Sequence, residues 1–143
     1  MTTLISFWVE GKPRAKQSFR VGNGVGYQSA RVKSWQNAVG WEAQKAMRAR
    51  GFQEPLAGHF TATLYFFMDN ARRVDWENLS KCVQDGLNGV VWIDDKQSIR
   101  GVVDKYVCRE KPGVFVRVES NDRPVEVSAA QIPLIVNGMM EAA

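Results

Sequence analysis

The apolar residues between positions 79 and 90 recur with the period of an α-helix. They stand at i, i+3, i+4, i+7, i+8 and i+11: Leu79, Cys82, Val83, Gly86, Leu87 and Val90. This spacing places them on one face of a helix, and a helix with one apolar face packs against a second layer. Asp75 stands at the expected N-cap, and Asn88-Gly89 supplies a stop. The segment therefore predicts a helix over about 76–89.

Strand-like and helix-like patterns alternate along the rest of the chain. The patterns predict strands at about 3–9, 60–68, 99–108 and 113–120, and a helix at about 33–49. We expect the last two strands to pair as an antiparallel hairpin. The order β-α-β-α-β-β indicates an α+β fold, with a mixed or antiparallel sheet and two helices on one face. We expect one domain over residues 1–120, followed at 121–143 by a tail that docks or is partly disordered.

Positive charge is concentrated in the first third of the chain. Residues 1–50 contain nine lysines and arginines and two glutamates, a surplus of seven, whereas the whole chain carries +4. The glycine-rich stretch Gly22–Gly26 lies in this region, but its spacing differs from the G-x-G-x-x-G of dinucleotide-binding turns. We expect a hairpin or loop there. The basic surplus favours a polyanionic partner, most commonly nucleic acid.

The sequence predicts a cytoplasmic protein. No stretch approaches the roughly 20 apolar residues of a membrane span. The first residues lack the charged region and cleavage site of a signal peptide. Cys82 and Cys108 lie in apolar segments, which is typical of free thiols in a reducing compartment.

Five carboxylates gather between residues 74 and 98 of this basic chain: Asp75, Glu77, Asp85, Asp94 and Asp95. One interpretation is local, because Asp75 would cap the helix, Glu77 would pair with Lys81, and the last two would stabilise a turn. The other is a cation site. If the turn folds back onto the helix, three carboxylates meet beside Lys81, and such oxygens are the ligands that Mg²⁺ prefers. Spacing alone leaves both interpretations open.

Two stretches in this region, VDWENLSK and WIDD, resemble the paired acidic motifs of the RusA family of Holliday junction resolvases, found in bacteria and their phages. The family pattern is Asp-x-Asp-Asn-x-x-Lys at the start of a helix, then an aromatic-aliphatic-Asp-Asp turn. Asp75, Glu77, Lys81 and Asp95 occupy the matching positions. Glu77 stands where the family usually has aspartate, so its carboxylate arm is one methylene longer. The likeness spans about residues 3–119.

The resemblance implies a homodimer that binds four-way DNA junctions and nicks two opposed strands. Asp75, Glu77 and Asp95 would bind Mg²⁺ or Mn²⁺, and Lys81 would assist the chemistry. The basic residues expected to contact DNA are Lys12, Arg14, Lys16, Arg20, Arg31, Lys33, Arg72 and Arg73. The alternatives are a protein of the same fold that binds branched DNA without cutting it, and a protein–protein adaptor that uses its apolar tail.

Overall fold

A four-stranded mixed sheet forms the centre of the molecule. The computed structural model describes residues 2–16, 20–22, 25–27 and 29–138. The sheet has the order β1-β6-β4-β5, made of β1 (Thr3–Glu10), β6 (Gly113–Ser120), β4 (Phe60–Met68) and β5 (Ser98–Val107). β6 runs antiparallel to both of its neighbours, and β5 runs parallel to β4. This confirms the predicted α+β class and the mixed sheet.

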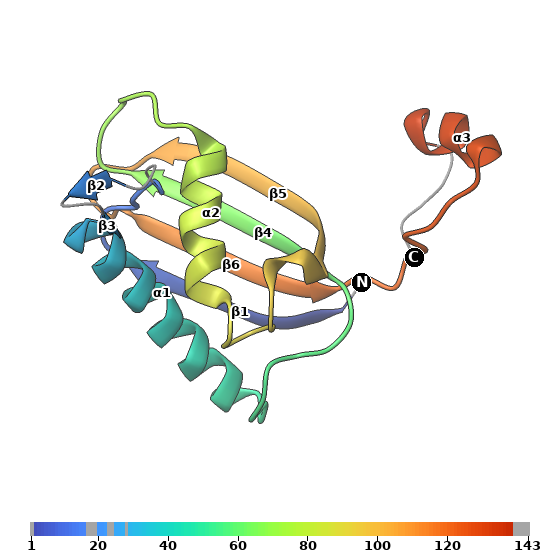
Figure 1. Cartoon of the computed structure of the whole chain (residues 1–143), viewed down its shortest axis with the longest axis horizontal. Helices are drawn as coiled ribbons and strands as arrows, with labels where there is room; N and C mark the ends of the chain where they lie inside the picture. The colour runs from blue at the N-terminus through green and yellow to red at the C-terminus, as the bar shows by residue number, and fades with distance from the viewer. Residues whose placement is uncertain (1, 17–19, 23–24, 28, 139–143) are drawn as a thin grey trace.

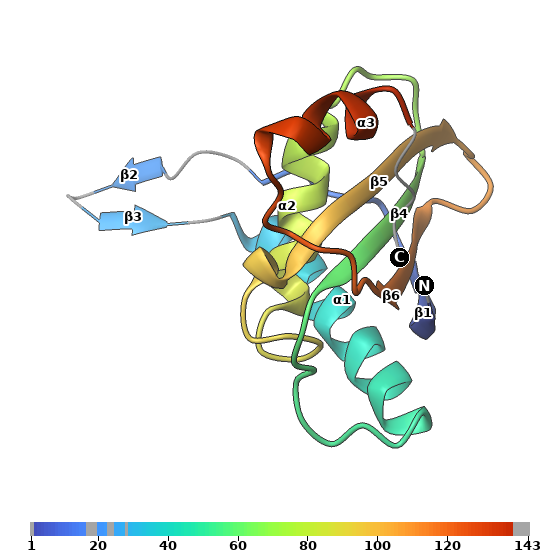
Figure 2. The ribbon, with the colours of Figure 1, turned by 90° about the vertical axis from the view of Figure 1, so that its right-hand side faces the viewer.

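Two helices, α1 (Ala30–Ala49) and α2 (Trp76–Leu87), cover one face of the sheet, as predicted (Figures 1 and 2). On α2, Leu79, Cys82, Val83 and Leu87 of the predicted stripe are buried, whereas Val90 lies beyond the end of the helix. The residues of α1 that face the core are Val32, Trp35, Val39, Ala43 and Met47. They pack on the inward side chains of the three strands β1, β4 and β6. Burial of these apolar side chains provides the main driving force for folding.

α1 and α2 approach each other closely where their glycines meet. A Cβ built on Gly86 would lie 2.8 Å from the carbonyl oxygen of Gln36 and 3.1 Å from Val39. A Cβ on Gly40 would lie 3.1 Å from the carbonyl oxygen of Gly86. The lack of a side chain at Gly86 therefore lets α2 rest directly on α1. This contact sets the height of α2 above the sheet.

The predicted hairpin between the last two strands was wrong. β5 and β6 follow each other in the sequence, yet β4 lies between them in the sheet. Their burial explains the order. β6 has three buried valines and lies in the interior of the sheet, whereas β5 exposes charged residues such as Arg100 and Asp104 and forms an edge. Charged side chains are tolerated on an edge strand and blunt its pairing with other chains.

Two segments project from this body. β2 (Arg20–Gly22) pairs antiparallel with β3 (Val25–Tyr27), which agrees with the expected hairpin. After β6 the chain runs through the short helices η2 (Ala129–Gln131) and α3 (Ile132–Val136), away from the sheet (Figure 1). The division at residue 120 stays a prediction. Within the described residues, no helix is both long and apolar enough to cross a bilayer.

Candidate active site along helix α2

Asp75 caps the start of α2, as its position in the sequence predicts. Its backbone is extended, and its Oδ1 accepts a hydrogen bond of 2.8 Å from the backbone N–H of Glu77. Asp75 and Glu77 are both exposed. Their carboxylates thus stand at the helix end where the backbone N–H groups favour negative charge.

The turn after α2 is held by three side chains. The indole N–H of Trp92, which is fully buried, donates to Oδ1 of Asn88 at 2.9 Å. The amide of Gln97 donates to the carbonyl oxygens of Leu56 and Gly58. These contacts fix the WIDD stretch against the body. They hold the loop that carries Asp94 and Asp95 in a single conformation.

Asp94 and Asp95 have different roles in this turn. Asp94 is the N-cap of the short helix η1 (Asp95–Gln97), and its Oδ1 accepts from the backbone N–H of Lys96 at 2.9 Å. This hydrogen bond lowers the pKa of Asp94. The local interpretation of Asp94 as a turn residue is therefore confirmed. Asp95 instead points back across α2, with its side chain only 17% exposed.

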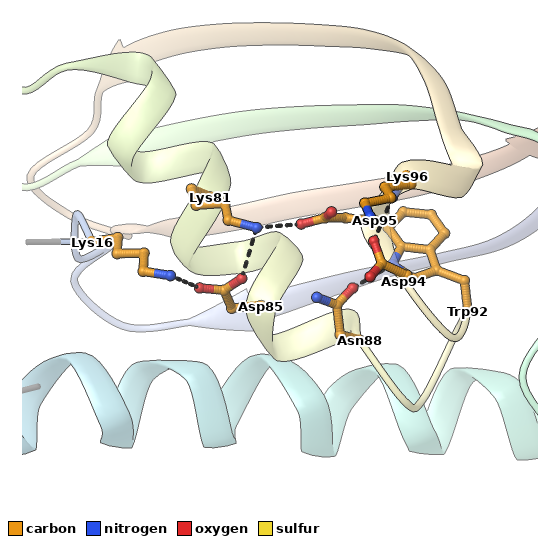
Figure 3. Close-up of polar contacts among 8 residues, drawn as sticks. All are labelled: Lys16, Lys81, Asp85, Asn88, Trp92, Asp94, Asp95 and Lys96. Carbon is orange, nitrogen blue, oxygen red and sulfur yellow. Dashed lines mark hydrogen bonds and ion pairs between the residues drawn. The ribbon is translucent and has the colours of Figure 1, made fainter.

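Four charged side chains form a row across α2: Lys16, Asp85, Lys81 and Asp95 (Figure 3). Nζ of Lys81 lies 2.5 Å from Oδ2 of Asp95 and 3.1 Å from Oδ1 of Asp85. Nζ of Lys16 lies 2.7 Å from the other oxygen of Asp85. The turn thus folds back against α2. The local interpretation expected Lys81 to pair with Glu77, but Lys81 pairs with Asp85 and Asp95 instead.

The environment of Lys81 keeps it charged. The hydrogen bond to Asp95 raises the pKa of Lys81, and the hydrogen bond to Asp85 acts in the same direction, against partial burial, which lowers the pKa. An ammonium group has three N–H donors. With two of them directed at aspartates, one remains available to a phosphate oxygen.

The three predicted metal ligands do not form one cluster within the described part of the chain. Asp75, Glu77 and Asp95 are donors of the type that hard divalent cations take. Across residues 2–16, 20–22, 25–27 and 29–138, however, no three histidine, cysteine or acidic side chains are grouped as metal ligands. The donor chemistry fits Mg²⁺, but this arrangement does not gather the donors. Joint ligation by these three carboxylates stays a prediction.

Five of the eight cationic residues predicted to contact DNA line one cavity of about 640 Å³: Lys12, Arg14, Arg31, Arg72 and Arg73. They come from the segment after β1, from the first turn of α1 and from the loop that leads into α2. Asp69 also lines the cavity and pairs with Lys12 at 3.3 Å. Val74, the residue directly before Asp75 in the sequence, also lines the cavity. The cavity thus adjoins the capped end of α2.

Of the other three predicted contacts, Lys16 and Lys33 lie outside this cavity. Lys16 turns inward to Asp85, and its backbone N–H donates to the carbonyl oxygen of Asn78 at 2.9 Å. Lys33 is exposed on α1 and lines a separate hollow with Trp41 and Asp85. Arg20 belongs to β2, and its side chain falls outside the described residues.

Sequence reasoning missed two residues near this site. Asp85 was counted among the acids but given no role, although its position four residues after Lys81 is the spacing of a helical ion pair. Lys105 on β5 donates to the carbonyl oxygen of Val74 at 2.6 Å and so holds the loop that precedes α2. No local pattern connects Lys105 to that loop, because the contact spans 31 residues.

The family assignment follows from the same region. The family described as Endodeoxyribonuclease RusA matches residues 10–119, which is most of the chain. The chain belongs to the RusA endodeoxyribonuclease family. No curated protein matches it. Membership confirms the resemblance and makes the functional class that of Holliday junction nucleases. Both acidic motifs, the row of charges across α2 and the basic cavity lie inside the matched range.

Proposed function

We propose that this RusA family member is an Mg²⁺-dependent endodeoxyribonuclease that resolves four-way DNA junctions by paired nicks. The observation that supports the proposal is the closeness of the basic cavity to the acidic helix end: five cations line a hollow that is also lined by Val74, the residue next to Asp75 in the sequence. Cations of this kind neutralise phosphates and position a duplex without reading its sequence. Positive charge beside the acids offsets the repulsion that the acids exert on DNA.

In the proposed reaction, the cavity cations hold the phosphates next to the start of α2. Lys81 donates its remaining N–H to a non-bridging oxygen of the scissile phosphate and stabilises the charge that develops there. Asp75, Glu77 and Asp95 would hold a divalent cation, whose chemistry when bound is to activate water and neutralise phosphate charge. To take part, Asp95 has to turn away from Lys81.

We further propose that the active form is a homodimer in the bacterial cytoplasm. A four-way junction presents two equivalent strands, and a two-fold symmetric dimer presents two equivalent sites. Large exposed apolar side chains near the site, including Trp41 at 57%, Trp76 at 53% and Ile93 at 72%, are available for a protein contact. Free cysteines agree with a reducing compartment.

The test is cleavage of a labelled four-way junction, compared with a linear duplex of the same arm sequence. The proposal predicts symmetric nicks in two opposed strands of the junction with Mg²⁺ or Mn²⁺, none with EDTA, and little cutting of the duplex. Junction binding without nicks in either metal would support the non-cleaving alternative. Sedimentation of the protein with and without the junction tests the dimer. A monomer on the junction would contradict paired cutting by one assembly.

A further inference from the structure

Asp85 connects two functional parts of the molecule. Its side chain is 19% exposed, and both of its oxygens are taken, one by Lys81 at 3.1 Å and one by Lys16 at 2.7 Å. Lys81 belongs to the catalytic helix, whereas Lys16 belongs to the basic segment that begins in the cavity. The family motifs used above do not include Asp85, and the proposed reaction so far gives it no task.

The position of Asp85 allows it to stay paired with Lys81 throughout the proposed reaction. In the structure, Lys81 rests between Asp85 and Asp95 (Figure 3). If Asp95 turns to a cation during the reaction, Lys81 loses one of these two partners. Lysine has a flexible four-carbon stem, so an ammonium group without a fixed partner has many positions to occupy. Asp85 lies one helical turn away on the same helix, so its contact with Lys81 does not depend on where the side chain of Asp95 points.

The contact with Lys16 adds a second constraint. Lys16 is tied to α2 twice, by its ammonium group to Asp85 and by its backbone N–H to the carbonyl oxygen of Asn78. Lys12 and Arg14 of the same segment line the basic cavity. The basic segment is therefore held against the helix that carries Lys81, and Asp85 is the side chain of α2 that contacts it.

We propose that Asp85 is a positioning residue, which holds Lys81 at the scissile phosphate and couples the basic segment to α2. This inference rests on the proposed nuclease function. It assigns Asp85 no contact with DNA or metal and no proton transfer. A carboxylate at this position would itself repel a phosphate. Its effect is therefore expected on the rate of the cleavage step and not on the strength of junction binding.

The experiment is a double-mutant cycle on Asp85 and Lys81 in the full-length protein, read as single-turnover junction cleavage at saturating enzyme. Asp85→Asn keeps the shape of the side chain but removes its charge. We expect the cleavage rate to fall by about 10- to 100-fold, the scale of a misplaced reacting group, with junction affinity unchanged or tighter. In the Lys81→Ala background, Asp85→Asn should add little, because two residues that act as one unit are not additive.

Two further variants separate positioning from folding. Asp85→Glu restores a carboxylate four residues from Lys81 and should recover part of the rate. Glu42→Gln removes a carboxylate that pairs with Lys45 on α1 at 3.0 Å, and it should leave cleavage unchanged. Thermal unfolding of each variant shows whether it is folded at the assay temperature.

The outcomes distinguish this inference from the proposed function. If the unmodified protein does not nick junctions, the proposed function fails and the inference falls with it. If it does nick them, and Asp85→Asn is equally fast, then only the positioning role is wrong. The role is also overturned if losses from Asp85→Asn and Lys81→Ala multiply, or if Asp85→Asn weakens binding as much as it slows cleavage. A full loss in Asp85→Asn with no recovery in Asp85→Glu would likewise contradict it.

Discussion

Replacing Gly86 by alanine tests the packing that sets the position of α2. The added Cβ would lie 2.8 Å from the carbonyl oxygen of Gln36 and 3.1 Å from two side-chain carbons of Val39. Ordinary carbon contacts are about 3.5 to 4.0 Å, so α1 and α2 have to separate by roughly half an ångström. Such overpacking costs about 1 to 3 kcal/mol. Alanine in a helix interior gains about 1 kcal/mol over glycine. Because the 2.8 Å approach is to a backbone oxygen, which cannot rotate away as a side chain can, we place the steric cost in the upper part of the overpacking range, at about 2 to 3 kcal/mol. We therefore expect a net loss of about 1 to 2 kcal/mol.

Gly40 provides the matched control, since it lies on the other helix of the same contact. A Cβ there would meet a single atom, the carbonyl oxygen of Gly86, at 3.1 Å. The gain in helix propensity of about 1 kcal/mol then balances or exceeds the smaller steric cost. Urea unfolding followed by tryptophan fluorescence measures the free energy of unfolding of both variants. Gly86→Ala with stability equal to that of the unmodified protein, or above that of Gly40→Ala, would refute the packing argument.

Three further predictions concern the strands, the thiols and the cavity. Gly113→Ala should lower the free energy of unfolding by about 3 kcal/mol or more, because the added Cβ would overlap the ring of Trp8. Gly101→Ala, whose Cβ would have no atom within 4 Å, should change it by less than about 0.5 kcal/mol. Denaturant unfolding compares the two variants. Burial raises the pKa of Cys82 to about 11, so this thiol stays protonated and unreactive at pH 8. A thiol reagent should therefore modify the native protein at the partly exposed Cys108 alone, and the unfolded protein at both cysteines. Alanine at any one of the five cavity cations should reduce the slope of log affinity for the junction against log salt by about 1; an unchanged slope would mean that the residue contacts no phosphate.

The local elements of the fold are readable from the sequence because each has its own period. The stripe from Leu79 to Leu87 is a face of α2, and the predicted strand 60–68 has the bounds of β4. The order of strands is not local in this way. Nothing in β5 or β6 taken alone says that β4 lies between them. That order depends on which strand buries more apolar surface in the finished sheet.

The sequence predicted which residues belong to the site better than it predicted which of them form ion pairs. The motif placed Asp75 at the helix start, because helix caps follow local rules. Spacing left open whether the turn returns to α2, and the contact between Asp95 and Lys81 is visible only in the structure. The partner of Lys81 depends on three-dimensional proximity. Glu77 and Asp85 are both four residues from it, and the structure selects Asp85, which is less exposed and is also held by Lys16. Likewise, the sequence showed that the segment with Lys12, Arg14 and Lys16 is basic, but it did not show that Lys16 points inward to Asp85.

The most direct test of the account is the single-turnover rate of junction nicking by Asp95→Asn, measured beside junction affinity. We predict a loss of rate of about 10²- to 10³-fold, the scale for removing one group that stabilises a transition state. Affinity should stay within about threefold of that of the unmodified protein, because the proposed phosphate contacts are those of the cavity cations. Asp104→Asn, which changes an exposed acid on β5, should cut normally. Unimpaired nicking by Asp95→Asn would contradict the claim that the acids around α2 carry out the hydrolysis.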